Sequence, residues 1–150
     1  MKLGAIILGS ILLLGIVVLV VWCEALPFNV DFADRVYVRF HYDKTKIDCE
    51  ITDKNDVRKL KNMFRTVSIT DKRGGTPSCG FDTDVSITFQ KNNRTVTICP
   101  GVDSCGNFRI GESNRYITFL SREKLKGFHK LFRKYHNNSS YYGWDKQWAD

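Results

Sequence analysis

Apolar and polar side chains alternate along residues 36–42, which read VYVRFHY. Successive side chains of a strand point to opposite faces, so Val36, Val38 and Phe40 fall on one face of an extended segment. Residues 47–51 alternate in the same way after a short polar turn. The two segments therefore predict a β-hairpin with one apolar face.

A second hairpin is expected at residues 85–98, where VSITF and TVTI flank the polar loop KNNR. Placing Ile87 opposite Ile98 also brings Phe89 opposite Val96, so that both apolar sets lie on the same face of the sheet. A shift by one residue would turn one of these sets to the other face. The sequence therefore predicts the register of this hairpin as well as its existence.

Two longer segments repeat apolar residues at spacings of three and four, which is the period of an amphipathic helix. Residues 54–65 follow Thr52 and Asp53, either of which can cap the first helical turn. Residues 122–135 follow Ser121, which can act in the same way. Further short strands are expected at residues 67–70, 108–110 and 116–120. The pattern predicts an α+β fold in which one antiparallel sheet of about five to seven short strands packs against two helices.

An apolar run precedes this pattern, and residues 3–22 contain no charged side chain. A helix of this length rises about 30 Å, which is the thickness of the hydrocarbon core of a bilayer. Trp22 ends the run, and tryptophan is frequent where a span meets the lipid headgroups. We therefore expect residues 1–22 to form an N-terminal transmembrane helix, either as an anchor or as an uncleaved signal.

The residues after the run leave other fates of the leader open. Cys23 and Ala25 are small residues three and one before a bond that a signal peptidase accepts, and cleavage near Ala25 would release a secreted domain. Lipid attachment at Cys23 is disfavoured, because a bacterial lipoprotein has a small residue before the modified cysteine and this chain has Trp22. An uncut anchor is the leading interpretation.

The chain divides into four parts on this interpretation, with the anchor first. Residues 23–35 are expected to be a juxtamembrane linker, residues 36–136 an extracytoplasmic domain, and residues 137–150 a polar tail rich in aromatic residues. Five cysteines suit an oxidising compartment better than the cytosol. We therefore place the domain outside the cytoplasm, attached to the membrane or secreted if the leader is cleaved.

The register of the hairpin at residues 85–98 also bears on cysteine pairing. Extended outward, this register places Cys79 one residue away from the position opposite Cys105. We therefore predict a disulfide bond between Cys79 and Cys105. The pairing of Cys79 with Cys99 remains the alternative, because a proline interrupts the extrapolated strand.

The formal net charge of +7 favours approach to anionic surfaces without specifying one of them. Basic residues gather in the helix at residues 122–135, and the aromatic tail follows, a combination that suits an anionic membrane or wall polymer. The candidate contact residues are Lys124, Lys126, Lys130, Arg133, Lys134, Tyr141, Trp144 and Trp148. Burial on the sheet is the stronger interpretation of this helix's apolar stripe. The scattered basic residues and the exported location argue against a nucleic acid partner.

No combination of residues identifies a reaction, and we expect no catalytic, cofactor-binding or metal-binding site. His129 and His136 have no carboxylate near them in the sequence, and with His41 they are interpreted as ordinary surface histidines. The sequence has no glycine-rich phosphate loop and no serine nucleophile motif. The enzymatic alternative is a small hydrolase that uses His41 or His129 with Asp82 or Asp84, which requires these groups to lie close together.

Four segments follow one another between residues 36 and 135, namely ITDKNDVRKL, SCGFDTDVSITF, VDSCGNF and RYITFLSREKLKGF. This order resembles small bacterial proteins, mostly from Gram-positive organisms, that are anchored in the membrane or secreted across it. The resemblance implies an α+β domain outside the cytoplasm and brings no established activity with it. We therefore expect a single-pass membrane protein whose small non-catalytic domain binds a protein or an anionic polymer outside the cell.

Overall fold

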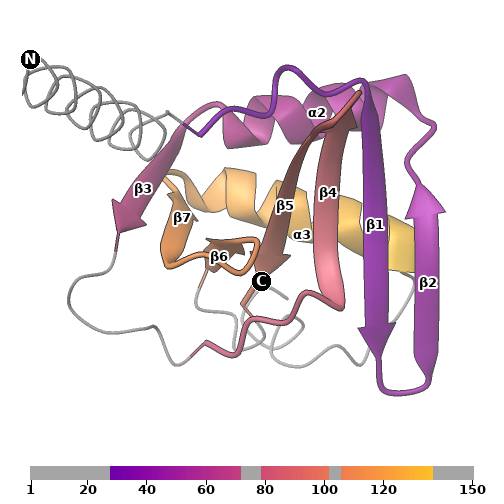
Figure 1. Cartoon of the computed structure of the whole chain (residues 1–150). Coiled ribbons are helices and arrows are strands. Elements are labelled where there is room, and N and C mark those ends of the chain that lie inside the picture. Colours follow the sequence, from indigo (N-terminus) through magenta and orange to yellow (C-terminus); the bar gives the residue numbers. More distant parts are fainter. Residues whose placement is uncertain (1–27, 72–78, 102–105, 137–150) are drawn as a thin grey trace, which may run out of the picture.

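The computed structural model describes residues 28–71, 79–101 and 106–136. Within these residues, seven antiparallel strands form one sheet and two helices cover one of its faces (Figure 1). The strands are β1 (Arg35–Tyr42), β2 (Thr45–Glu50), β3 (Val67–Asp71), β4 (Val85–Lys91), β5 (Arg94–Pro100), β6 (Asn107–Ile110) and β7 (Arg115–Phe119). The helices are α2 (Lys54–Phe64) and α3 (Arg122–His136). The prediction of an α+β fold with one antiparallel sheet and two packed helices is confirmed.

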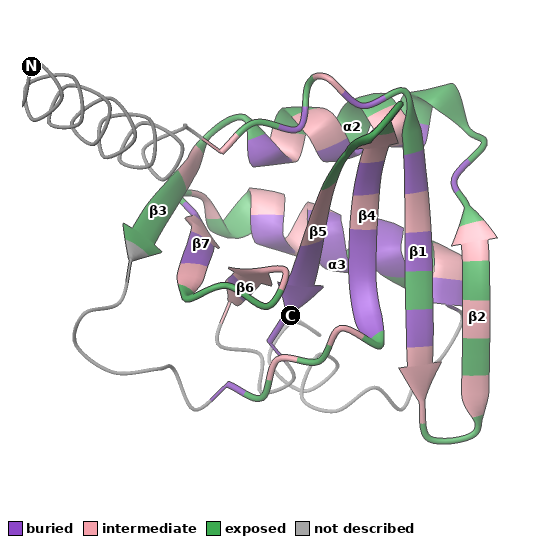
Figure 2. Ribbon diagram, viewed as in Figure 1, coloured by how far each residue is buried: buried purple, intermediate pink, exposed green. Residues whose placement is uncertain are grey.

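The strand order across the sheet is β2-β1-β4-β5-β6-β7-β3. Both predicted hairpins are present, formed by β1 with β2 and by β4 with β5. The second hairpin has the predicted register, with Ile87 opposite Ile98 and Phe89 opposite Val96. Figure 2 shows the alternation of buried and exposed residues along β1, where Val36, Val38 and Phe40 are buried on the helical side.

The helices begin at the predicted capping residues. The Asp53 carboxylate accepts hydrogen bonds from the backbone amides of Asn55 and Asp56, which the first turn of α2 leaves without intrahelical partners. The Ser121 hydroxyl accepts from the backbone amide of Lys124 at the start of α3. Local capping chemistry therefore fixes where both helices start.

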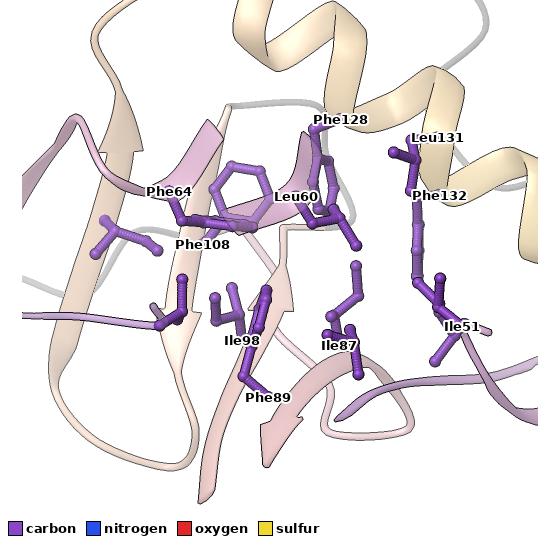
Figure 3. Close-up of a cluster of buried hydrophobic side chains, with 14 of the residues drawn as sticks. Ile51, Leu60, Phe64, Ile87, Phe89, Ile98, Phe108, Phe128, Leu131 and Phe132 are labelled. Atoms are coloured by element: carbon purple, nitrogen blue, oxygen red, sulfur yellow. The ribbon is translucent and has the colours of Figure 1, made fainter. Parts of the chain in front are cut away.

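Aromatic side chains fill the space between the sheet and the helices (Figure 3). Phe64 of α2 lies at the centre, with its ring 5.7 Å from that of Phe89 and 5.9 Å from that of Phe108. Phe128 of α3 packs against the same ring at 5.8 Å. The apolar stripes of α2 and α3 are therefore buried against the sheet, as the sequence pattern predicts.

The core extends to the N-terminal side of β1, into residues expected to belong to a linker. Val30 and Ala33 are buried, and Phe28 and Phe32 pack against the same cluster. The expected transmembrane helix at residues 1–22 and the tail at residues 137–150 lie outside the described residues. Among the residues that are described, neither helix has the length and apolar character needed to cross a bilayer.

The hairpin ladder does not continue outward as the disulfide prediction assumed. On the N-terminal side of β4 the chain departs from the register of the hairpin. Phe81 forms a bridge with Gly101, three residues before position 104, which the extrapolated register would place opposite Phe81. Cys79 is disulfide-bonded, whereas Cys99 is a buried free thiol, so the alternative pairing of these two residues is wrong. The pairing of Cys79 with Cys105 stays a prediction, because Cys105 lies outside the described residues.

Candidate functional site: a groove on the open face of the sheet

A groove of about 630 Å³ crosses the face of the sheet that the helices leave open. Most of its walls come from the outward-facing residues of β2, β1, β4 and β5, because alternate side chains of these strands point away from the core. The turn between β6 and β7 adds Glu112. The lining residues include Tyr37, Arg39, Asp48, Glu50, Ser86, Thr88, Gln90, Thr97 and Glu112. The volume lies within the range of sites for small molecules or short peptide segments.

Hydroxyl groups on the floor of the groove are bonded to neighbouring protein groups. The Thr88 and Thr97 hydroxyls lie 3.1 Å apart across β4 and β5. The Ser86 hydroxyl donates to the backbone carbonyl of Thr83 at 2.8 Å. The Ser86 proton is directed to a backbone carbonyl and not to a general base, so Ser86 is not arranged as an activated nucleophile.

Carboxylates outnumber cations along the groove. Asp48, Glu50 and Glu112 line it together with a single guanidinium, that of Arg39. Arg39 Nε lies 3.0 Å from Asp48 Oδ1, and this bond is the main reason why the pKa of the Asp48 carboxyl is lowered. The Arg35 guanidinium lies beside the groove, where it donates to the Tyr37 hydroxyl at 3.3 Å and its charge interacts with that of Glu50. Among the lining side chains carboxylates still exceed cations, so the groove is weakly acidic although the whole chain is basic, and it suits cationic or neutral polar groups better than anionic ones.

His41 lies between two carboxylates at one end of this face. Its Nε2 atom lies 2.6 Å from Asp48 Oδ2, and its Nδ1 atom lies 3.9 Å from Asp84 Oδ1. The backbone amide of His41 also donates to the carbonyl of Asp84 at 2.8 Å. The sequence hypothesis combined His41 or His129 with Asp82 or Asp84. Of these pairs the structure brings His41 and Asp84 together, and it adds Asp48.

His41 and the two carboxylates form an ion-pair cluster, and the histidine is not placed as a general base would be. Both ring nitrogens of His41 face carboxylates, so neither points toward open solvent where a substrate proton would lie. Asp82 does not join the cluster, because its carboxylate accepts from the backbone amide of Asp84 in a local turn at 2.9 Å. His129 lies in α3, on the other side of the sheet, and does not approach the groove.

The interpretation of His129 and His136 as surface histidines is wrong. Both are buried, with 9% and 2% of their surface exposed. Burial, aided by the nearby Arg133 guanidinium, lowers the pKa of each ring to about 4. Their positions continue the apolar stripe of α3 at spacings of three and four from Leu125 and Phe132, a signal that is present in the sequence.

The basic residues of α3 do not form one uniform surface. Lys134 lies 2.5 Å from the buried carboxylate of Asp56 in α2, and Lys124 donates to the hydroxyl of Thr66. Lys130 and Arg133 are exposed on the helix. The predicted aromatic contacts Tyr141, Trp144 and Trp148 lie outside the described residues. Contact of this helix with an anionic surface therefore stays a prediction, carried by fewer of its lysines than expected.

Among residues 28–71, 79–101 and 106–136, no three His, Cys, Asp or Glu side chains are grouped so that they could hold a metal ion. Comparison of the chain with protein-family models, with curated proteins and with solved structures gave no match. The groove and its chemistry are therefore the basis on which a function can be assigned to the described residues.

Proposed function

We propose that this chain is a single-pass membrane protein that displays a small non-catalytic binding domain outside the cell. The apolar run at residues 3–22 supports the anchor, and the five cysteines support an oxidising compartment. The observation that carries the binding role is the acidic groove on the open face of the sheet. Cleavage near Ala25 would convert the same domain into a secreted binding protein.

The groove favours a protein partner over an anionic polymer. An incoming phosphate or carboxylate would meet three carboxylates and a guanidinium that already pairs with Asp48. A segment of protein with lysine, arginine or hydroxyl side chains would instead find complementary carboxylates, and the ring of Tyr37 offers an apolar surface beside them. An anionic polymer remains suited to the exposed basic residues of α3 and not to the groove.

Site-specific photocrosslinking in intact cells tests the binding role. We would place a photoreactive amino acid at Tyr37, inside the groove, and at Lys59, on the exposed surface of α2 as a matched control. The proposal expects a defined crosslinked protein at Tyr37 but not at Lys59. It also expects this product to be lost with Glu50→Lys, which reverses one charge of the groove. Equal labelling at both positions would contradict the groove as the binding site.

Protease added to intact cells tests the location separately. The proposal expects the protease to reach and cleave the domain from outside while the leader stays in the membrane fraction. A domain that is protected in intact cells and cleaved only after lysis would place it in the cytoplasm and contradict the proposed orientation.

A small hydrolase is the second candidate, favoured by the approach of His41 to Asp84 at 3.9 Å. Catalysis would require Asp48 to release Nε2 of His41 when a substrate enters, so that the ring can accept a proton from water. His41→Asn would abolish any such hydrolysis while leaving the fold intact, since the ring is partly exposed. Turnover of a substrate that is lost with His41→Asn would replace the non-catalytic proposal.

A further inference from the structure

β2 forms one edge of the sheet within the described residues, with β1 as its neighbour on the other side. An edge strand exposes backbone amides and carbonyls that can pair with a further strand. The backbone amide of Ile51 donates to the carbonyl of Val36 at 2.8 Å, which fixes which residues face β1. Because hydrogen-bonding pairs alternate along an antiparallel ladder, Ile47 and Cys49 turn their backbone groups toward β1. Lys46, Asp48 and Glu50 therefore turn theirs outward.

The side chains on the same edge are divided by charge. Lys44 and Lys46 precede Ile47 in the sequence, and Asp48 and Glu50 follow it. All four charged residues are exposed. Lys46, Asp48 and Glu50 point to the helix-free face, whereas Ile47 lies on the helical side and is half-buried. The edge thus has a basic half and an acidic half on either side of one apolar residue.

We propose that β2 pairs with β2 of a second copy of this chain, around a twofold axis that passes through Ile47. In this antiparallel register, Lys46 of each copy lies opposite Asp48 of the other, and Lys44 lies near Glu50. The outward backbone groups of Lys46 and Asp48 then form the new ladder. The two Ile47 side chains meet on the helical side, and the sheet continues from one copy into the next.

The charges of β2 favour this register over registers in which the twofold axis passes through a nearby residue. Moving the axis to Asp48 would place the two copies of this carboxylate face to face, and moving it to Lys46 would do the same with two ammonium groups. Moving it to Cys49 would oppose Asp48 with Glu50. Only the axis at Ile47 gives opposite charges at every directly opposed position of the outer face. If the charges served only to prevent edge-to-edge pairing, a single sign along the strand would serve best, because two copies would then repel each other in every register. β2 carries both signs instead.

Charge reversal with rescue tests the pairing. Two copies of the full chain, each with a different affinity tag, are co-expressed, extracted from the membrane in mild detergent and purified through one tag. We expect the two wild-type copies to co-purify. Lys46→Glu in both copies, or Asp48→Lys in both, places like charges opposite each other twice and should lower recovery of the second tag about tenfold.

The combination of one Lys46→Glu copy with one Asp48→Lys copy provides the decisive comparison. Opposite charges then face each other at both positions again, so recovery should return to the wild-type level. Asp48→Lys also removes the ion pairs with Arg39 and His41, but loss of folding in that variant would not be reversed by mixing. Absence of co-purification of the wild-type chain, persistence in Lys46→Glu, or absence of rescue between two variants that each purify as folded proteins would overturn the pairing. The groove proposal does not depend on these results.

Discussion

The imidazole of His136 stacks on the ring of Phe40, with ring centroids 4.1 Å apart and planes inclined by 8°. The stack joins the last turn of α3 to the middle of β1 in the interior of the domain. A protonated ring would carry its charge into this apolar contact. The buried histidine therefore makes the fold sensitive to acid.

We predict that the free energy of unfolding falls as the pH is lowered from about 6.5 to about 4. The pKa of His136 is about 4 in the folded chain, whereas its ordinary value is 6.5, so the unfolded chain binds the extra proton in this interval. The contribution is complete above pH 6.5, and its loss is complete below about pH 4. The expected loss is on the order of 1 kcal/mol for each pH unit crossed, measured by urea unfolding followed by circular dichroism.

His136→Phe keeps an aromatic ring beside Phe40 and removes the titrating group. We expect this variant to lose a clear part of the slope between pH 6.5 and pH 4, and buried His129 to contribute to the slope that remains. The lowered pKa of Asp56 acts at lower pH and so does not obscure the comparison. An unchanged slope in His136→Phe would show that this ring does not control acid sensitivity.

Asp56→Asn should destabilise the domain by about 1.5 to 3 kcal/mol. The buried Asp56 carboxylate accepts hydrogen bonds from Lys134 at 2.5 Å and from the Tyr135 hydroxyl at 2.8 Å, and these bonds join α2 to α3. Lys59→Ala is the matched control, because exposed Lys59 lies 3.7 Å from the same carboxylate and such pairs contribute at most about 1 kcal/mol. Equal effects of the two variants on the urea midpoint would contradict this ranking.

Phe64→Ala should cost about 3 to 5 kcal/mol, because it removes the ring at the centre of the aromatic cluster and leaves a cavity. Its contacts include a ring 5.0 Å away, that of Phe119. Leu120→Ala deletes a side chain that is 71% exposed and should change the unfolding free energy little. Thermal unfolding of both variants measures the difference. A small effect of Phe64→Ala would mean that the neighbouring rings close the cavity.

Gly127→Ala should stabilise α3 by up to about 1 kcal/mol, since alanine is the better helix former. An added Cβ atom would meet the terminal methyl group of Met63 at 3.0 Å. This methyl group ends a flexible side chain and can move aside. Gly106→Ala is the opposite case, because Gly106 has a φ of +72° and its Cβ atom would meet Leu125. We expect a higher melting temperature for the first variant and a lower one for the second.

Local patterns predict the helices, strands and hairpins because the residues that determine each of them lie close together in the sequence. The spacing of Leu60 and Phe64 identifies the buried side of α2, and the match of Ile87 with Ile98 identifies a register. The pairing of β1 with β4 has no comparable local signal, since their contact joins segments separated by two strands and a helix. Sequence reasoning therefore could not assemble the groove, although it identified the strands that line it.

The two carboxylates near His41 are placed there by the registers of β1 with β2 and with β4, which residue types alone do not reveal. Asp48 follows from the β1 and β2 hairpin, whose pairing places this carboxylate opposite Arg39 and diagonally from His41. Asp84 approaches His41 only because β4 lies on the other side of β1. The sequence hypothesis named Asp84 by residue type alone, and only the order of strands accounts for its approach to His41. The hypothesis missed Asp48, although the register of the first hairpin places it beside His41.

The strand order also governs when the fold can be completed. β3 comes early in the sequence, but it pairs with β7. Ile69 can therefore pair with Ile117 only after most of the domain has been synthesised. Closing such long loops slows folding relative to the closure of a hairpin. The hairpin of β4 and β5 can form at once and offers a template for β1 on one side and β6 on the other. A chain that ends before residue 115 lacks β7, so both hairpins can form while β3 has no strand to pair with. The unpaired backbone groups of β3 then make the incomplete chain prone to aggregation.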